Sequence, residues 1–179
     1  PAYNENNNIV LGVAEGGKMM TLYQVNIIDY LLETKNIDQL NELFFKTMHH
    51  EFAHILHQTK NYPTEYNSLS EGHYSPSGWN NRHNMADYAP FGFVTAYGSS
   101  EPGEDIAEVT ACYLTWTPEQ WTQLKAGAGN EGWSIIQQKI TIMKKYMKDN
   151  YGIDMDNLRS TIDRRCTELQ TMDLTELPD

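Results

Sequence analysis

The sequence predicts an α+β fold, with a small N-terminal β-sheet, one long helix and a mainly helical C-terminal half. Apolar segments near the N-terminus flank a glycine turn, a long segment without glycine or proline comes next, and later segments place apolar residues at helical spacing. A chain of 179 residues, 40% of them hydrophobic, can bury one core. We find no internal repeat and no linker, so residues 1–179 are expected to form a single domain.

The N-terminal sheet is predicted from residues 9–13 and 19–28, two strand-like segments on either side of the Glu15-Gly16-Gly17 turn. The resulting hairpin could lie along a cleft and offer an edge strand to an extended peptide. Only about 35 residues precede the long helix, so we expect either a reduced sheet or earlier strands that lie outside this chain.

A long helix is predicted over residues 37–58. One face carries an apolar stripe and is expected to be buried, whereas a second face carries histidines and is expected to point into a cleft. The apolar stripe comprises Leu40, Phe44, Met48, Phe52 and Ile55, and the second stripe comprises Leu43, Thr47, His50, His54 and His57.

The segment His50-Glu51-Phe52-Ala53-His54 lies in the middle of this helix. Residues four apart share a helix face, so His50 and His54 can bind one metal ion while Glu51 lies beside a water on that ion. This pattern is typical of zinc-dependent hydrolases, in which the glutamate takes a proton from the metal-activated water and returns it to the leaving amine. The alternative is a helix whose histidines only satisfy hydrogen bonds. His57 is a rival ligand, but a hydrogen bond at the rim of the cleft explains it better.

Residues 59–101 are rich in Asn, Ser, Gly, Pro and Tyr and predict a series of turns rather than regular structure. Their aromatic side chains argue against disorder. We expect an ordered wall of the cleft or, alternatively, a cover over the core. The aromatic residues are Tyr66, Tyr74, Trp79, Tyr88, Phe91 and Phe93.

A third protein ligand is expected beyond this connection, because a catalytic zinc takes three protein ligands and leaves one position to water. Lys60 stands where a metzincin would have its third histidine, which excludes that class. Glu104 and Glu108 are four apart on a predicted helix, so one can bind zinc while the other accepts a hydrogen bond from a ligating histidine. Asp105 is an alternative ligand, and helix capping by carboxylates of the first turn is an alternative explanation of the cluster.

Three more helices are predicted beyond the helix of the acidic cluster, which ends near Trp116. We expect them to support the second half of the cleft. The first begins at the capping box Thr117-Pro118-Glu119-Gln120 and extends to about Lys125, the second covers residues 131–151 and stops at Gly152, and the third covers residues 155–169.

The composition limits the classes of partner that this protein is expected to bind. The net charge of −11 argues against nucleic acid, which selects basic faces. No apolar stretch is long enough to span a membrane. Cys112 and Cys166 lie in predicted helices and are expected to be free thiols, with one disulfide between them as the alternative.

Taken with Tyr97, the histidine motif and the acidic cluster resemble those of gluzincin metallopeptidases, in particular lethal-factor-type toxins and the zinc-binding metallopeptidase domains of Bacteroidetes lipoproteins. The resemblance covers roughly residues 18–116. It implies a zincin-like fold in which Glu104 is the third zinc ligand, Glu108 contacts a ligating histidine, and Tyr97 points its phenol at the developing oxyanion.

The motif and the resemblance together imply a zinc-dependent peptidase that acts on peptide or protein substrates with Zn²⁺ as its cofactor. One alternative is a peptidase that cuts only beside a sugar of a glycoprotein. Another is an inactive zinc-binding module that recognises protein or glycan partners, against which the intact Glu51 argues. The resemblance also implies export to the periplasm or the cell surface as a lipoprotein, with a lipid anchor upstream.

Overall fold

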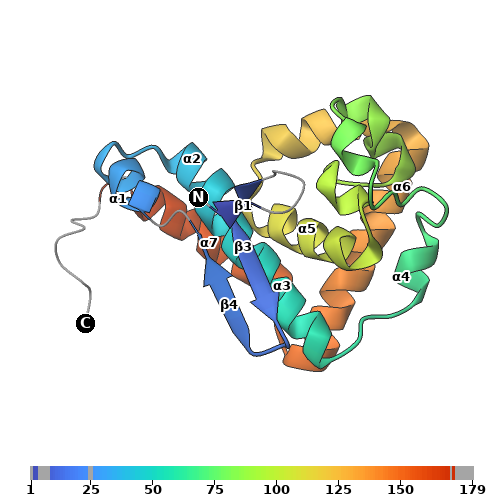
Figure 1. Ribbon diagram of the computed structural model, residues 1–179, viewed down its shortest axis with the longest axis horizontal. Coiled ribbons are helices and arrows are strands. Elements are labelled where there is room, and N and C mark those ends of the chain that lie inside the picture. Colours follow the sequence, from blue (N-terminus) through green and yellow to red (C-terminus); the bar gives the residue numbers. More distant parts are fainter. Residues whose placement is uncertain (1, 4–8, 24–25, 170, 172–179) are drawn as a thin grey trace.

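The computed structural model describes residues 2–3, 9–23, 26–169 and 171, and its α+β arrangement confirms the predicted fold class (Figure 1). Two antiparallel strand pairs lie at the N-terminus, and helices make up most of the remaining chain. The first pair consists of β1 (Ala2–Tyr3) and β2 (Ile9–Val10), and the second consists of β3 (Gly12–Glu15) and β4 (Met19–Leu22).

The predicted hairpin forms around Gly16 and Gly17, which both adopt the positive φ that a tight turn requires. The second predicted strand was too long, because β4 ends at Leu22 and helix α1 (Asn26–Glu33) comes after it. The apolar residues at the end of the predicted strand lie on α1 instead, where they follow helical spacing. Leu31 of the same helix is buried. Residues 24 and 25 of the prediction lie outside the described residues.

The predicted long helix exists, but it contains a π-helical segment. Helix α2 (Ile37–Leu40) continues through the π-helical residues Asn41–Phe45 into α3 (Lys46–Thr59). A π turn holds more residues than an α turn, so the faces before and after it no longer align. The predicted apolar stripe is therefore wrong at Phe52, which is 47% exposed, while Leu40 is buried.

Helix α3 packs against both the N-terminal hairpin and helix α5 (Pro102–Thr115) (Figure 1). Most residues of α5 are buried, so its polar side chains point either into the core or at α3. Pro102 occupies the first turn of α5, where its missing N–H leaves no hydrogen bond unmade. The contact between α3 and α5 brings the two sequence motifs together.

The connection from α3 to α5 consists of short turns, as predicted. Its aromatic residues serve both expected purposes: Tyr66 and Phe93 are buried in the core, whereas Trp79 and Tyr97 line a cavity beside α3. The regular pieces are α4 (Glu65–Ser68) and 3₁₀ turns at Trp79–Asn81, Met85–Asp87, Ala89–Phe91 and Tyr97–Ser99.

The C-terminal half contains α6 (Pro118–Tyr151) and α7 (Met155–Leu169). Thr117 caps α6 through the predicted capping box with Gln120. The first two predicted C-terminal helices correspond to the two parts of α6, which are divided by the non-helical backbone of Gly129, so the first part extends beyond Lys125.

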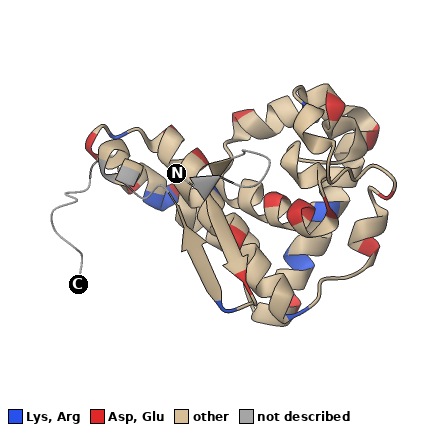
Figure 2. Ribbon diagram, in the orientation of Figure 1, with Lys and Arg blue, Asp and Glu red and all other residues tan. Residues whose placement is uncertain are grey.

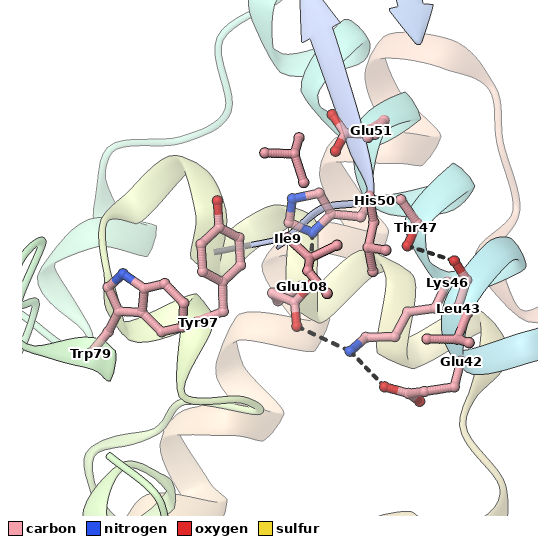
Figure 3. A pocket seen from close by; sticks show the side chains of 13 residues that line it. Ile9, Glu42, Leu43, Lys46, Thr47, His50, Glu51, Trp79, Tyr97 and Glu108 are labelled. Carbon is pink, nitrogen blue, oxygen red and sulfur yellow. Dashed lines mark hydrogen bonds and ion pairs between the residues drawn. The ribbon is translucent and has the colours of Figure 1, made fainter. Parts of the chain in front are cut away.

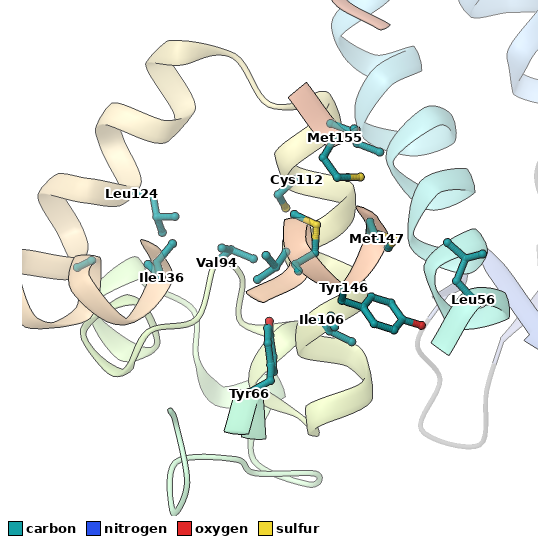
Figure 4. Close-up of a cluster of buried hydrophobic side chains, with 14 of the residues drawn as sticks. Leu56, Tyr66, Val94, Ile106, Cys112, Leu124, Ile136, Tyr146, Met147 and Met155 are labelled. Carbon is teal, nitrogen blue, oxygen red and sulfur yellow. The ribbon is translucent and has the colours of Figure 1, made fainter. Parts of the chain in front are cut away.

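The main core lies where α5, α6 and α7 meet the turns of the connection (Figure 4). Cys112 is buried and Cys166 half-buried, and both are free thiols, as expected. None of the described helices has the length and apolar content to cross a bilayer. The sequence has 24 acidic and 13 basic residues, and Figure 2 shows both kinds at scattered positions along the described ribbon.

Candidate metal centre

Three side chains from two helices converge at the contact between α3 and α5. His50 and His54 come from successive turns of α3, and Glu104 comes from the first turn of α5. The Nε2 atoms of His50 and His54 lie 3.0 Å apart, and Glu104 Oε2 lies 3.0 Å from the first and 3.2 Å from the second. The structure therefore brings the three predicted ligands into one nearly equilateral triangle.

This triangle has the size and donor set that zinc requires. Ligand atoms about 2.1 Å from a tetrahedral zinc ion lie about 3.4 Å from one another, a few tenths of an ångström more than the distances between these three atoms. Two histidine nitrogens and one glutamate oxygen are also a known donor set of catalytic zinc, which leaves the fourth position open. Among the described residues, these three form the cluster of His, Cys, Asp and Glu side chains that fits a metal ion.

The electrostatics of the triangle favour a bound cation. His50 Nδ1 lies 2.8 Å from Glu108 Oε1, so a proton on Nδ1 leaves the lone pair of Nε2 facing the Glu104 carboxylate. Burial alone would lower the pKa of His50, but hydrogen bonds with Glu104 and Glu108 raise it to about 10. Burial alone would raise the pKa of Glu104, but His50 and His54 lower it to about 2. Electron-rich atoms this close need a proton or a metal ion between them.

Glu108 lies behind His50, on the side of the ring away from the triangle. Besides contacting His50, it accepts a hydrogen bond of 2.7 Å from Thr95 Oγ1. It also lies 3.4 Å from Lys46 Nζ (Figure 3). Lys46 and His50 hold the pKa of Glu108 well below its usual range, although burial acts in the opposite direction. From this position the Glu108 carboxylate can accept a hydrogen bond from His50 Nδ1 and fix the orientation of that ring.

Asp105, the alternative ligand, does not reach the triangle. Its side chain is fully buried and forms an ion pair of 2.6 Å with Lys139, also fully buried, and it accepts a hydrogen bond from Tyr74. The helical rotation between adjacent residues turns Asp105 into the core while Glu104 faces α3. His57 also stays outside the triangle, because its Nε2 lies 2.7 Å from His54 Nδ1.

Glu51 lies beside the triangle and is only 7% exposed. Burial raises the pKa of its carboxyl, while His50 and His54 act to lower it. Strand β3 passes directly over this side chain: a Cβ on Gly12 would lie 2.6 Å from Glu51 Cγ and 2.8 Å from Oε1. The absence of a side chain at Gly12 thus leaves the space that the Glu51 carboxylate occupies.

Tyr97 lies between His50 and Trp79 (Figure 3). Its ring centroid is 5.8 Å from that of His50 and 4.9 Å from that of Trp79. Burial and the charge of Glu104 raise the pKa of Tyr97 well above its usual value, so its hydroxyl stays protonated and can donate a hydrogen bond. The structure places Tyr97 at the edge of the site, where it lines both adjoining cavities.

Two adjoining cavities open on either side of the triangle. One of about 340 Å³ extends toward Leu43 and Trp79, and the other, of about 410 Å³, extends toward His57 and Glu101. Both cavities are lined by Val10, Gly12, His50, Glu51 and Tyr97. Together they form a cleft bounded on one side by residues 9–14.

Sequence reasoning missed three residues of the site. Lys46 lies one helical turn before His50, and this spacing could have indicated that it shares the histidine face. Gly12 and Thr95 had no such signal, because their contacts with Glu51 and Glu108 depend on tertiary packing.

An α+β chain in which two histidines of one helix meet a glutamate of a second helix has the layout of proteins with a single catalytic zinc. The chain belongs to the Peptidase_Mx1 family, described as "Putative zinc-binding metallo-peptidase", whose model matches residues 1–156. The family description names zinc, the metal predicted from the sequence, and agrees with the predicted resemblance.

A solved structure shares this fold. The crystal structure of a "putative zinc-binding metallo-peptidase" from Bacteroides caccae is 52% identical in sequence, with a TM-score of 0.79. The similarity covers 89% of the present chain and 59% of the other, so the present chain spans less than two thirds of that protein. No curated protein matches the chain.

Proposed function

We propose that this chain is a zinc-dependent peptidase in which His50, His54 and Glu104 bind the metal and Glu51 is the general base. The observation that carries the proposal is the triangle of ligand atoms, 3.0 to 3.2 Å on a side, beside a buried glutamate in an open cleft. The family description and the related crystal structure support both the metal and the reaction class.

The described residues can perform the proton transfers of peptide hydrolysis. When bound, zinc supplies Lewis acidity, which polarises a carbonyl and lowers the pKa of water from about 15.7 to about 7. Glu51 accepts a proton from the attacking water and passes it to the leaving amine. The Tyr97 hydroxyl donates a hydrogen bond to the carbonyl oxygen as negative charge develops, and loss of such a donor typically costs about 2.7 to 4 kcal/mol.

The cleft suits an extended peptide. Strand β3 pairs with β4 along one edge, and residues of β3 line the cavity beside His54 and Glu104. A peptide can therefore pair with β3 through main-chain hydrogen bonds while its side chains enter the two cavities. The cavity toward the N-terminal end of α3 has an apolar side, which suits an apolar substrate side chain, and a polar side that includes Glu42 and Lys46. The apolar side is formed by Ile9, Leu11, Leu43 and Trp79.

Elemental analysis and peptide digestion of the purified chain and its variants test this proposal. We expect near-stoichiometric zinc in both the native chain and Glu51→Gln, but hydrolysis of a peptide mixture by the native chain and not by Glu51→Gln. Glu104→Ala is expected to lose most of its zinc, because one of three protein ligands is gone. Zinc retained in Glu104→Ala but lost in Glu108→Ala would move the ligand by one helical turn.

A second digest separates a general peptidase from a glycoprotein-directed one. The native chain is incubated with a glycoprotein before and after enzymatic deglycosylation. We expect cleavage of both forms. Cleavage of the glycosylated form alone would establish the glycoprotein-directed activity, and zinc binding without cleavage of any substrate in the peptide and glycoprotein sets would support the inactive binding module.

A further inference from the structure

We propose that His57 is a positioning residue that orients His54 toward the metal by accepting a hydrogen bond from His54 Nδ1–H. This inference rests on the proposed zinc site and extends it. Two turns of α3 would then supply His50 as the first ligand, His54 as the second ligand and His57 as the residue that orients His54. The contact between the two rings and the place of each ring in the site support this role.

The two rings meet through their nitrogen atoms. His54 Nδ1 lies 2.7 Å from His57 Nε2, and the ring planes are 71° apart. The other nitrogen of His54, Nε2, points into the triangle, 3.0 Å from His50 Nε2 and 3.2 Å from Glu104 Oε2. His54 thus has one nitrogen at the metal site and the other in contact with His57.

The chemistry of imidazole fixes the direction of this hydrogen bond. A neutral imidazole has one proton, and a metal binds the nitrogen without it. With His54 Nε2 at the metal, the proton is on Nδ1, which therefore donates. His57 Nε2 must accept, so the proton of the His57 ring is on its own Nδ1. Metal-bound histidines almost always donate their second N–H to such a partner, which fixes ring orientation and tautomer.

The ring of His57 lies between Tyr62 and the start of α5. Tyr62 packs against it edge to face, with ring centroids 5.7 Å apart and planes 87° apart. On the α5 side, a Cβ on Gly103 would lie 3.7 Å from His57 Cε1, at ordinary contact distance. The ring thus has neighbours in both the connection and α5, the helix that supplies Glu104.

His57 complements the role of Glu108 at the other histidine. Glu108 Oε1 lies 2.8 Å from His50 Nδ1, almost the same distance as that between His54 and His57. Each ligating histidine therefore has one partner on the side away from the triangle, a carboxylate for His50 and an imidazole for His54. His57 is not itself a ligand in this arrangement, because the ring of His54 lies between its Nε2 and the triangle.

Zinc affinity tests the inference directly. The dissociation constant of zinc is measured by competition with a chromophoric chelator for the native chain, His57→Phe and His57→Gln. Phenylalanine keeps a ring but has no acceptor, whereas the amide oxygen of glutamine can replace Nε2. We expect zinc to bind about 10- to 100-fold more weakly to His57→Phe, and His57→Gln to recover most of the loss. His83→Phe, at an exposed histidine, is the matched control and should bind as the native chain does.

A spectroscopic measurement separates positioning from general stability. Replacement of zinc by Co²⁺ gives visible bands that report on ligand geometry, and we expect these bands to change in His57→Phe and to return in His57→Gln. Native affinity and native bands in His57→Phe would overturn the inference while leaving the zinc site intact. Equal losses in both His57 variants would also overturn it. A native chain that binds no zinc would instead overturn the proposed function.

Discussion

Three acidic residues within one helical turn of α5 have three different surroundings. Glu104 faces the two histidines, Asp105 is paired with Lys139 in the core, and Glu108 contacts the back of His50. Each residue of an α-helix is rotated by about 100° from the one before, so neighbours in sequence reach different sides of the helix. Glu104 and Glu108 share the α3 side because they are four apart. The same carboxylate group is thus a candidate metal ligand in Glu104, the contact to His50 in Glu108 and half of a buried ion pair in Asp105.

Gly12→Ala is predicted to reduce catalysis without removing the metal. The added Cβ would lie 2.6 Å from Glu51 Cγ, so the Glu51 side chain would have to move. A displacement of about 1 Å at a catalytic group can cost about 100-fold in rate. We therefore expect kcat/KM on a cleaved peptide to fall by about that factor while the zinc content stays unchanged.

Ala126→Ser is the matched control for this substitution, because Ala126 is exposed on α6 and lines neither cavity. It also adds one heavy atom and should leave kcat/KM close to the native value. If Gly12→Ala kept native activity, the close approach of β3 would have no role in placing Glu51.

At the scale of elements, the π-helical residues Asn41–Phe45 change which face of the long helix is buried. Apolar spacing alone predicted one continuous stripe, yet Leu40 is buried before this segment and Phe52 is exposed after it. The histidine face still points into the cleft, because His50 and His54 both lie in the α-helical part. π turns recur at functional sites, where they alter the alignment of helix faces.

Thr117→Ala is predicted to destabilise the chain through the start of α6. The Thr117 hydroxyl accepts a hydrogen bond from the N–H of Gln120, and the Gln120 side chain accepts one from the N–H of Thr117. Loss of such an N-cap typically costs about 1 kcal/mol. We expect urea unfolding of the metal-free protein to show a decrease of this size in the free energy of unfolding.

Thr122→Ala provides the comparison, since Thr122 is exposed in the interior of the same helix, where alanine is the better helix former. Its free energy of unfolding should equal or slightly exceed the native value. An equal decrease in both variants would show that the capping box contributes nothing specific.

For the whole molecule, the ion pair of Lys139 and Asp105 links three parts of the fold. Lys139 comes from α6, Asp105 from α5, and Lys139 Nζ also donates to Gly92 O of the connection at 2.8 Å. Its ammonium lies 4.4 Å from the ring centroid of Phe93. Burial lowers the pKa of Lys139 and raises that of Asp105, so each charge depends on its partner. The pair connects α6 to α5 at the residue next to Glu104, which reaches α3.

Lys139→Met is therefore predicted to cost about 3 to 5 kcal/mol of stability, because it leaves the Asp105 carboxylate buried without a cation. The double substitution with Asp105→Asn removes both charges and keeps an acceptor for Tyr74, so it should recover much of this loss. Urea unfolding of the metal-free proteins measures both values.

Lys145→Met is the matched control for the buried pair, because Lys145 forms an exposed ion pair with Asp149 on the same helix. Exposed pairs contribute little, so this variant should unfold close to the native midpoint. A Lys139→Met variant as stable as this control would show that the buried pair does not hold the fold together.

The sequence by itself determined the motif helix, the glycine turn, the capping box and the set of candidate ligands. These features are local: spacing along a helix places His50 and His54 on one face, and neighbouring residues form the cap at Thr117. Strand length and the buried face of the long helix were predicted less well, because apolar spacing does not show where β4 ends or where a helix adds a π turn.

Only the tertiary structure decided which acidic residue meets the histidines and what covers Glu51. Glu104 reaches the triangle because α5 packs against α3, and Gly12 reaches Glu51 because β3 crosses the same helix. The partners in these contacts are separated by tens of residues in the chain, and the spacing of residues in the sequence does not indicate that they pair. The sequence therefore determined that histidines and a carboxylate are the candidate ligands. The packing of elements distant in sequence determined which carboxylate meets the histidines and at what distances.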